Sequence, residues 1–309
     1  MAILGRAGLA GAAALLATVA LVPLLRSPSG GDTVAPATTT MAAAEPVAAV
    51  PGVVVPAPIT APAAVTVPAD RLEGPQPVST CQQIAYNVAK ANPGTTQVIV
   101  VLTATAASTT GTLQVADLGA QGWQCGAAMT ARVGRSGVRP LLDRRSGDGT
   151  TPAGVFPLGR MTAWDGQQFS FFGNAADPGV SAGPYRRVQY GDCFGATPNH
   201  PDYGHLVYRT PGNCPGPDDE YLPAITGAYV HAALIGANME PDVSGDAPGE
   251  TPYAAAIFLH RHSYDGNGAS KPTSGCVSLS QTNLVSVLRA MRPGVMFAIG
   301  QTDWLLANT

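Results

Sequence analysis

The stretch that most constrains this chain lies late in the sequence, where residues 258–280 read FLHRHSYDGNGASKPTSGCVSLS. The apolar run 254–259 leads into it and is typical of a buried strand. Gly275 lets the backbone turn tightly beside Cys276. Apolar side chains then repeat at helical spacing up to residue 291. A strand, a tight turn that holds a cysteine, and a helix are therefore expected in this order.

Cys276 is the candidate nucleophile of this stretch. A thiolate nucleophile needs a base that takes its proton and backbone N–H groups that hold the developing oxyanion. We expect the N–H groups around Ser274, Gly275 and Cys276 to hold the oxyanion. His260 and His262 are both candidates for the base, because residues two apart on a strand point to the same face. The alternative interpretation is that Cys276 is an inert buried thiol.

The helix after the cysteine bears on the reactivity of the thiol. Ser278 and Gln281 form a candidate capping box, and Ser280 is an alternative N-cap. Either start would place Cys276 just before a helix N-terminus, where the dipole lowers a thiol pKa from about 8.5. The dipole contributes only about 0.3–1 kcal/mol, too little to make a thiolate at neutral pH. We therefore expect His260 to act as a general base during attack.

These residues resemble a known family, the L,D-transpeptidases with a YkuD-type catalytic domain. The family motif is a histidine at a strand end, a variable loop, and then Ser/Thr-x-Gly-Cys. It matches His260 and Thr273-Ser274-Gly275-Cys276. Residues 147–156, which read GDGTTPAGVF, are similar to the family's T-P-x-G-x-F segment, and residues 229–238 resemble the strand before the histidine strand. The resemblance covers residues 97–299.

The resemblance implies an activity. It implies an exported cysteine L,D-transpeptidase that acts on peptidoglycan stem peptides through a thioester on Cys276 and forms 3→3 cross-links. It assigns the base to His260, and it leaves His262, Thr273 and Ser278 as candidate substrate contacts. No metal and no organic cofactor is required. β-Lactams of the carbapenem type become candidate covalent inhibitors.

Two alternative functions remain open. The same nucleophile could pass the acyl group to water, which would make the protein an L,D-carboxypeptidase or endopeptidase. The domain could also bind the cell wall without catalysis, although the presence of both His260 and Cys276 argues against this. The chain departs from the usual family pattern at Ser274, where many members have a second histidine, and at Ser278, where arginine or asparagine is common.

Five cysteines in an exported chain predict two disulfides and one free thiol. Cys276 is the one we expect to be free, because its surroundings indicate catalysis. The other four allow three pairings, of which we prefer Cys81–Cys125 and Cys193–Cys214. The second bond would staple residues 173–223, a long stretch rich in Gly, Pro and Asp that we expect to border the cleft.

The N-terminal residues divide into two segments. Residues 1–27 carry Arg6 and then a mostly apolar run, as a signal peptide or an uncleaved signal anchor does. Residues 28–78 are rich in Ala, Pro and Thr and lack the large side chains of a core, so we expect a disordered linker. Residues 79–309 are the expected catalytic domain. The protein would then be located in the cell wall or outside the cell, or held on the outer face of the plasma membrane by the anchor alone.

Composition limits the fold class and the partners. Only 12% of the residues are charged and the net charge is -3, so nothing indicates the basic patch of a nucleic-acid partner. Apolar runs at residues 98–102, 112–118 and 123–133, separated by Gly-rich turns, predict strands. We expect a mostly β, β-sandwich-like domain with a few helices, the first of which begins near Ser79 or Thr80.

Overall fold

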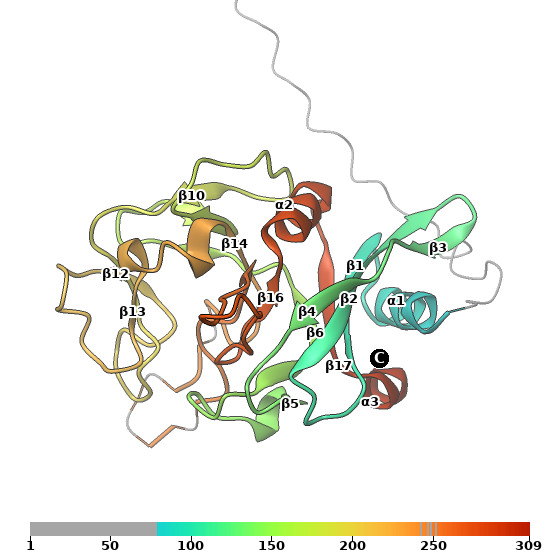
Figure 1. The fold of residues 1–309 in the computed structure, drawn as a ribbon, viewed down its shortest axis with the longest axis horizontal. Coiled ribbons are helices and arrows are strands. Elements are labelled where there is room, and N and C mark those ends of the chain that lie inside the picture. The colour runs from blue at the N-terminus through green and yellow to red at the C-terminus, as the bar shows by residue number, and fades with distance from the viewer. Residues whose placement is uncertain (1–78, 242, 246, 248, 251) are drawn as a thin grey trace, which may run out of the picture. The chain divides into compact units, whose positions relative to one another are not determined.

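The structure, a computed structural model, describes residues 79–309 except 242, 246, 248 and 251. The segments expected as a signal or anchor (1–27) and as a linker (28–78) lie outside the described residues. The described part is mostly β with three α-helices, which confirms the predicted fold class (Figure 1). The helices are α1 (Thr80–Ala91), α2 (Gln281–Ala290) and α3 (Thr302–Asn308). Across these described residues, no helix is long and apolar enough to cross a membrane.

Most strands belong to one twelve-stranded sheet, ordered β10-β9-β14-β15-β16-β4-β2-β1-β17-β6-β5, with β3 paired to β2. Four neighbouring pairs run parallel: β1 with β17, β5 with β6, β9 with β10, and β15 with β16. The strands are β1 (Gln97–Thr103), β2 (Thr110–Gly119), β3 (Gly122–Cys125), β4 (Met129–Arg132), β5 (Val138–Pro140), β6 (Thr151–Pro157), β9 (Phe171–Gly173), β10 (Tyr185–Arg187), β14 (Ala232–Leu234), β15 (Phe258–Arg261), β16 (Val277–Leu279) and β17 (Met296–Gln301).

The long Gly/Pro/Asp-rich stretch 173–223 is more regular than its sequence indicates. It contains β10 and a separate three-stranded sheet, ordered β12-β11-β13. This small sheet consists of β11 (Asp192–Phe194), β12 (Leu206–Tyr208) and β13 (Glu220–Tyr221). A two-stranded pair, β7 (Met161–Thr162) with β8 (Gln168–Phe169), and short 3-10 turns, among them η4 (Ala228–Val230), complete the connections.

Two strand predictions need correction. Residues 123–133 form two strands, β3 and β4, and both pair with β2. The N–H of Gly126 bonds to Val115 O after β3, and the register against β2 is different when pairing resumes in β4. The apolar run 254–259 is a strand only from Phe258 onward. Ala256 has a positive φ of 53°, a conformation that interrupts an extended backbone.

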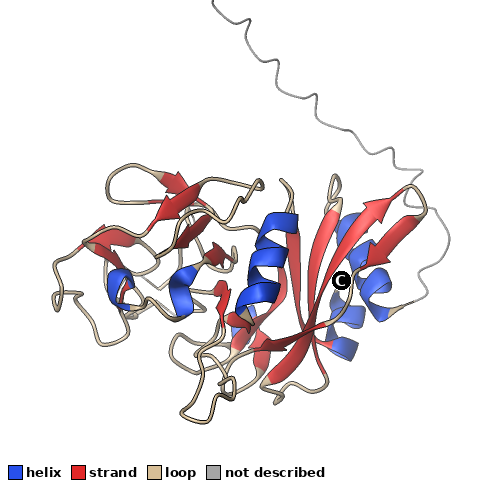
Figure 2. Ribbon diagram, turned by 45° about the horizontal axis from the view of Figure 1, so that its top comes forward, coloured by secondary structure: helices blue, strands red, loops and turns tan. Residues whose placement is uncertain are grey.

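Both faces of the central strands are buried. Ile99 and Val101 of β1 face a core that also receives side chains from β14, β15, β16 and α2, and this shared core makes the large sheet sandwich-like. Val98 and Val100 point to the opposite face, where α1 and α3 pack. Both helices contact β17, and they lie on the same side of it in both views (Figures 1 and 2).

Both of the preferred disulfides are formed. Cys81–Cys125 ties α1 to β3, and Cys193–Cys214 ties β11 to the segment that leads into β13. Cys276 forms no disulfide. The second bond therefore constrains the small sheet that contains β13.

Candidate active site

Cys276 lies at the end of a tight turn, directly before β16. Thr273 closes this turn, because its Oγ1 accepts the N–H of Gly275 at 3.2 Å and donates to the carbonyl oxygen of Cys276 at 2.6 Å. Gly275 has a φ of +153°, and a Cβ there would lie 3.1 Å from the carbonyl oxygen of Thr150. The turn therefore requires glycine at residue 275 in order to present the cysteine.

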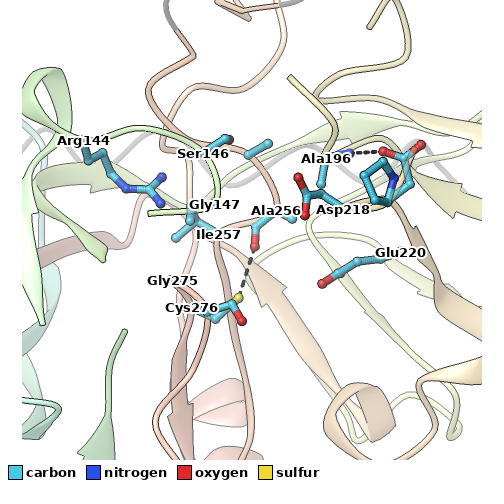
Figure 3. Close-up of a pocket in the computed structure, with 14 residues that line it drawn as sticks. Arg144, Ser146, Gly147, Ala196, Asp218, Glu220, Ala256, Ile257, Gly275 and Cys276 are labelled. Carbon is cyan, nitrogen blue, oxygen red and sulfur yellow. Dashed lines mark hydrogen bonds between the residues drawn. The ribbon is translucent and has the colours of Figure 1, made fainter. Parts of the chain in front are cut away.

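Two backbone groups hold the Cys276 thiol, which is only 8% exposed. Its S–H donates to the carbonyl oxygen of Ala256 at 3.1 Å (Figure 3). The N–H of Phe258 donates to Sγ at 3.4 Å. The first contact stabilises the neutral thiol and the second stabilises a thiolate, so the two hydrogen bonds have opposite effects on ionisation.

The surroundings raise the pKa of the thiol, whereas the helix had been expected to lower it. Burial has the largest effect, the negative charge of Glu220 adds to it, and the pKa of Cys276 rises to about 12. Helix α2 begins at Gln281, and its N-cap is Ser280, whose Oγ accepts the N–H of Asn283 at 3.3 Å. The whole of β16 separates Cys276 from this N-terminus, and a helix dipole acts only near its first turn.

His260 lies on β15, beside the strand that follows the cysteine, and its register partner there is Ser278. Nδ1 is 2.7 Å from the carbonyl oxygen of Arg261, which can only accept, so Nδ1 carries the proton and Nε2 is left as an acceptor. Burial lowers the pKa of His260 to about 4, so the ring is neutral at neutral pH. No hydrogen bond between described residues joins this ring to Cys276, whose S–H is bound to Ala256.

Two pockets meet at the cysteine and form the cleft. The first has a volume of about 330 Å³ and extends from Cys276 toward Arg144 and Asp218 (Figure 3). The second has a volume of about 270 Å³ and contains His260 and Tyr229. The residues common to both pockets are Glu220, Ser274 and Cys276. A substrate chain could therefore pass on both sides of the thiol, with the reacting group over Cys276.

Three residues of the cleft were not anticipated from the sequence: Arg144, Glu220 and Tyr229. Glu220 belongs to β13 of the small sheet and Tyr229 to η4, and both reach the cleft only through tertiary packing. The Tyr229 hydroxyl donates to Glu220 Oε2 at 2.6 Å, and the Tyr229 ring meets the His260 ring edge-on with centroids 5.4 Å apart. Burial raises the pKa of Glu220 to about 7. Tyr229 begins the 229–238 resemblance, but nothing in that segment indicates a cleft residue, and no local motif marks Glu220.

Of the three candidate substrate contacts, only Thr273 lines the cleft, whereas His262 and Ser278 do not. Thr273 lines the second pocket, although its hydroxyl already closes the turn. His262 and Ser278 are buried and pair with each other, Nδ1 to Oγ at 2.9 Å, and neither lines either pocket. Ser278 is also the register partner of His260, so His262 is engaged beside β16 and does not reach the cleft.

The segment 147–156 packs against the turn that holds Cys276 and hydrogen-bonds to it. Its Thr151 Oγ1 accepts the N–H of Gly134 at 2.8 Å and donates to the carbonyl oxygen of Cys276 at 3.2 Å. Asp148 Oδ1 accepts the N–H of Thr150 at 2.8 Å, and Gly147 lines the first pocket. The segment therefore serves both as the entry to β6 and as part of the cleft wall.

Comparison with known proteins agrees with this geometry. No curated protein matches the chain. The family model of the L,D-transpeptidase catalytic domain, YkuD, matches residues 118–299, a range that includes β6, the His260 strand and the Cys276 turn. The match spans more than half of the chain, and it confirms the family that the motifs indicate. The chain therefore belongs to the YkuD family of L,D-transpeptidase catalytic domains.

Proposed function

We propose that the protein is an exported cysteine L,D-transpeptidase that joins peptidoglycan stem peptides by 3→3 cross-links through a thioester on Cys276. The observation that carries this proposal is the place of Cys276, at the junction of two pockets and beside a neutral histidine. Family membership supports peptidoglycan peptides as the substrate class. The two disulfides support an oxidising location outside the cytoplasm, as does the apolar segment 1–27.

In the acylation step, the S–H of Cys276 leaves the carbonyl of Ala256 and gives its proton to Nε2 of His260. The sulfur attacks the carbonyl carbon of the third stem residue, a diamino acid, while the N–H groups of Ser274 and Cys276 hold the oxyanion, since the N–H of Gly275 is already bound to Thr273 Oγ1. The bond from this carbon to the nitrogen of D-Ala breaks, and His260 returns the proton to the departing amine. A thioester and free D-Ala result.

In the transfer step, an amine of a second stem peptide replaces D-Ala in the cleft. It attacks the thioester carbon and gives a proton to His260, and the carbon–sulfur bond breaks. The proton then returns to Cys276, so the enzyme is restored without any net redox change. Nε2 serves as acceptor and donor in turn, a role that the hydrogen bond from Nδ1 to Arg261 permits because it fixes the tautomer.

Intact-mass measurement after incubation with a tetrapeptide donor tests the proposal. We expect a covalent adduct that lacks the mass of D-Ala, and we expect no adduct in the Cys276→Ala variant. With an acceptor peptide present, a cross-linked dimer supports transpeptidation, whereas trimmed monomer alone would show that water is the acceptor. If neither the tetrapeptide nor a carbapenem forms an adduct, the domain is a non-catalytic binding module.

A further inference from the structure

Glu220 occupies a special place in the cleft, because it is one of only three residues that line both pockets beside the nucleophile. It reaches this place from β13, a strand of the small sheet, and not from the sheet that carries His260. Figure 3 shows Cys276 between Glu220 and Arg144. Because both pockets include Glu220 where they meet, a group that lies over the sulfur comes close to this carboxylate.

The Glu220 carboxylate is held firmly at one oxygen and is unpaired at the other. Oε2 accepts the Tyr229 hydroxyl at 2.6 Å. Among the described residues Oε1 has no hydrogen-bond donor, and no Lys, Arg or His forms an ion pair with Glu220. Glu220 is half-buried and lines both pockets, so its carboxylate faces the cleft.

A carboxylate beside Cys276 disfavours ionisation of the thiol unless the substrate brings a positive charge that compensates for it. Its negative charge lies near a thiol that must lose a proton, and it raises the pKa of Cys276. Arg144 lowers the pKa of Cys276, but by less than Glu220 raises it, and Arg144 pairs with Asp148. The other charged groups of the two pockets are Asp218 and Asp219, which add negative charge, and Lys271, which is exposed without an ion pair to Glu220. A cation delivered with the substrate would both pair with Oε1 and remove this opposition.

We propose that Glu220 binds the side-chain ammonium group of the diamino residue in the donor stem peptide and thereby selects donors that carry this charge. The inference rests on the proposed function for the class of substrate. The reacting carbonyl and the ammonium group belong to the same residue of the donor. When the carbonyl lies over Cys276, a side chain that enters either pocket meets Glu220.

Binding to a chemically inactive protein tests the inference. In the Cys276→Ala background, calorimetric titration compares a tetrapeptide donor with the same peptide acetylated on the side-chain amine. We expect the free ammonium peptide to bind about tenfold more tightly, as one charge-assisted hydrogen bond would provide. Adding Glu220→Gln, which keeps the acceptor for Tyr229, should reduce this ratio to about twofold or less.

The controls separate recognition of charge from general effects. Asp303→Asn removes an exposed carboxylate on α3 and should leave the ratio at about tenfold. Equal affinity of the two peptides for the parent protein, or an equal loss of both upon Glu220→Gln, would overturn the inference. Failure of both peptides to bind would overturn it as well. In that case a carbapenem adduct on wild-type Cys276 would show that the proposed acyl chemistry stands without it.

Discussion

The ionisation state of Cys276 before substrate arrives can be measured directly by alkylation with neutral iodoacetamide. The two pKa values, about 12 for Cys276 and about 4 for His260, place the proton on sulfur. At 1.36 kcal/mol for each pKa unit, an imidazolium–thiolate pair would cost on the order of 10 kcal/mol in the free protein. We therefore expect a neutral thiol and a neutral imidazole, with proton transfer only during attack.

The same pKa values determine how much more slowly the folded protein should be alkylated. Raising the thiol pKa from 9.0 to about 12 lowers the thiolate fraction at pH 7 roughly a thousandfold. A more basic thiolate is also a better nucleophile, with a Brønsted slope of about 0.4–0.5, which recovers roughly twentyfold. The folded protein should then react about fiftyfold more slowly at pH 7 than the unfolded chain.

The unfolded reference is available in the same protein. In urea without reductant, Cys276 is the one thiol that can react, because the other four cysteines are in disulfides. Restricted access would lower the folded rate by the same factor at every pH. A raised pKa instead lets the folded rate keep climbing about tenfold for each pH unit above pH 9, where the rate of the unfolded chain levels off. A wild-type rate that is flat between about pH 5 and 8 would show a preformed thiolate and refute the reasoning.

Three further predictions concern the turn, the carboxylate and the small sheet. Gly275→Ala should cost about 1–3 kcal/mol of unfolding free energy, seen by thermal melting, and should abolish carbapenem labelling, because a Cβ meets Thr150 O at 3.1 Å. Glu220 has a pKa raised to about 7, so its stabilising contribution is complete below about pH 4.3 and is lost as pH rises through 7. Glu220→Gln should therefore be more stable than wild type by up to about 3 kcal/mol at pH 8.5 and similar at pH 4, and a pH-independent difference in urea melts would contradict this. Replacing Cys193 and Cys214 by serine opens a loop with a sequence separation of 21, should lower stability by about 3 kcal/mol, and should raise KM more than it lowers kcat.

The local parts of the site could be predicted from the sequence, because short-range chemistry determines them. Apolar periodicity fixed the helix after the cysteine, and the Ser280 cap was one of two starts that the sequence allowed. The turn at Gly275 follows from a residue that tolerates a φ of +153°. The strand that carries His260 also stood out as an apolar run, although a single positive φ at Ala256 shortened it.

The electrostatics of the site could not be read in the same way. Glu220 lies in a Gly/Pro-rich stretch without periodicity, and only its pairing with Phe194 across β11 and β13 brings it to the cleft. The thiol pKa was expected to fall because the helix start was counted in residues along the sequence. It rises because β16 intervenes and because burial, a property of the whole fold, has the larger effect. His262 seemed equivalent to His260 by strand spacing alone, but it pairs with Ser278 and only His260 lines the cleft.

The raised thiol pKa and the unpaired carboxylate point to the same mode of operation. A thiolate formed in advance would react with any electrophile that entered the cleft. Here the S–H is bound to Ala256, the base is neutral, and a carboxylate beside the sulfur opposes ionisation. If a donor ammonium group pairs with Glu220, the same binding event that places the carbonyl over Cys276 also removes that opposition. Glu220 lowers the stability of the folded protein at neutral pH, but it would make the enzyme selective for charged donors. An uncharged electrophile would leave the sulfur as an unreactive thiol.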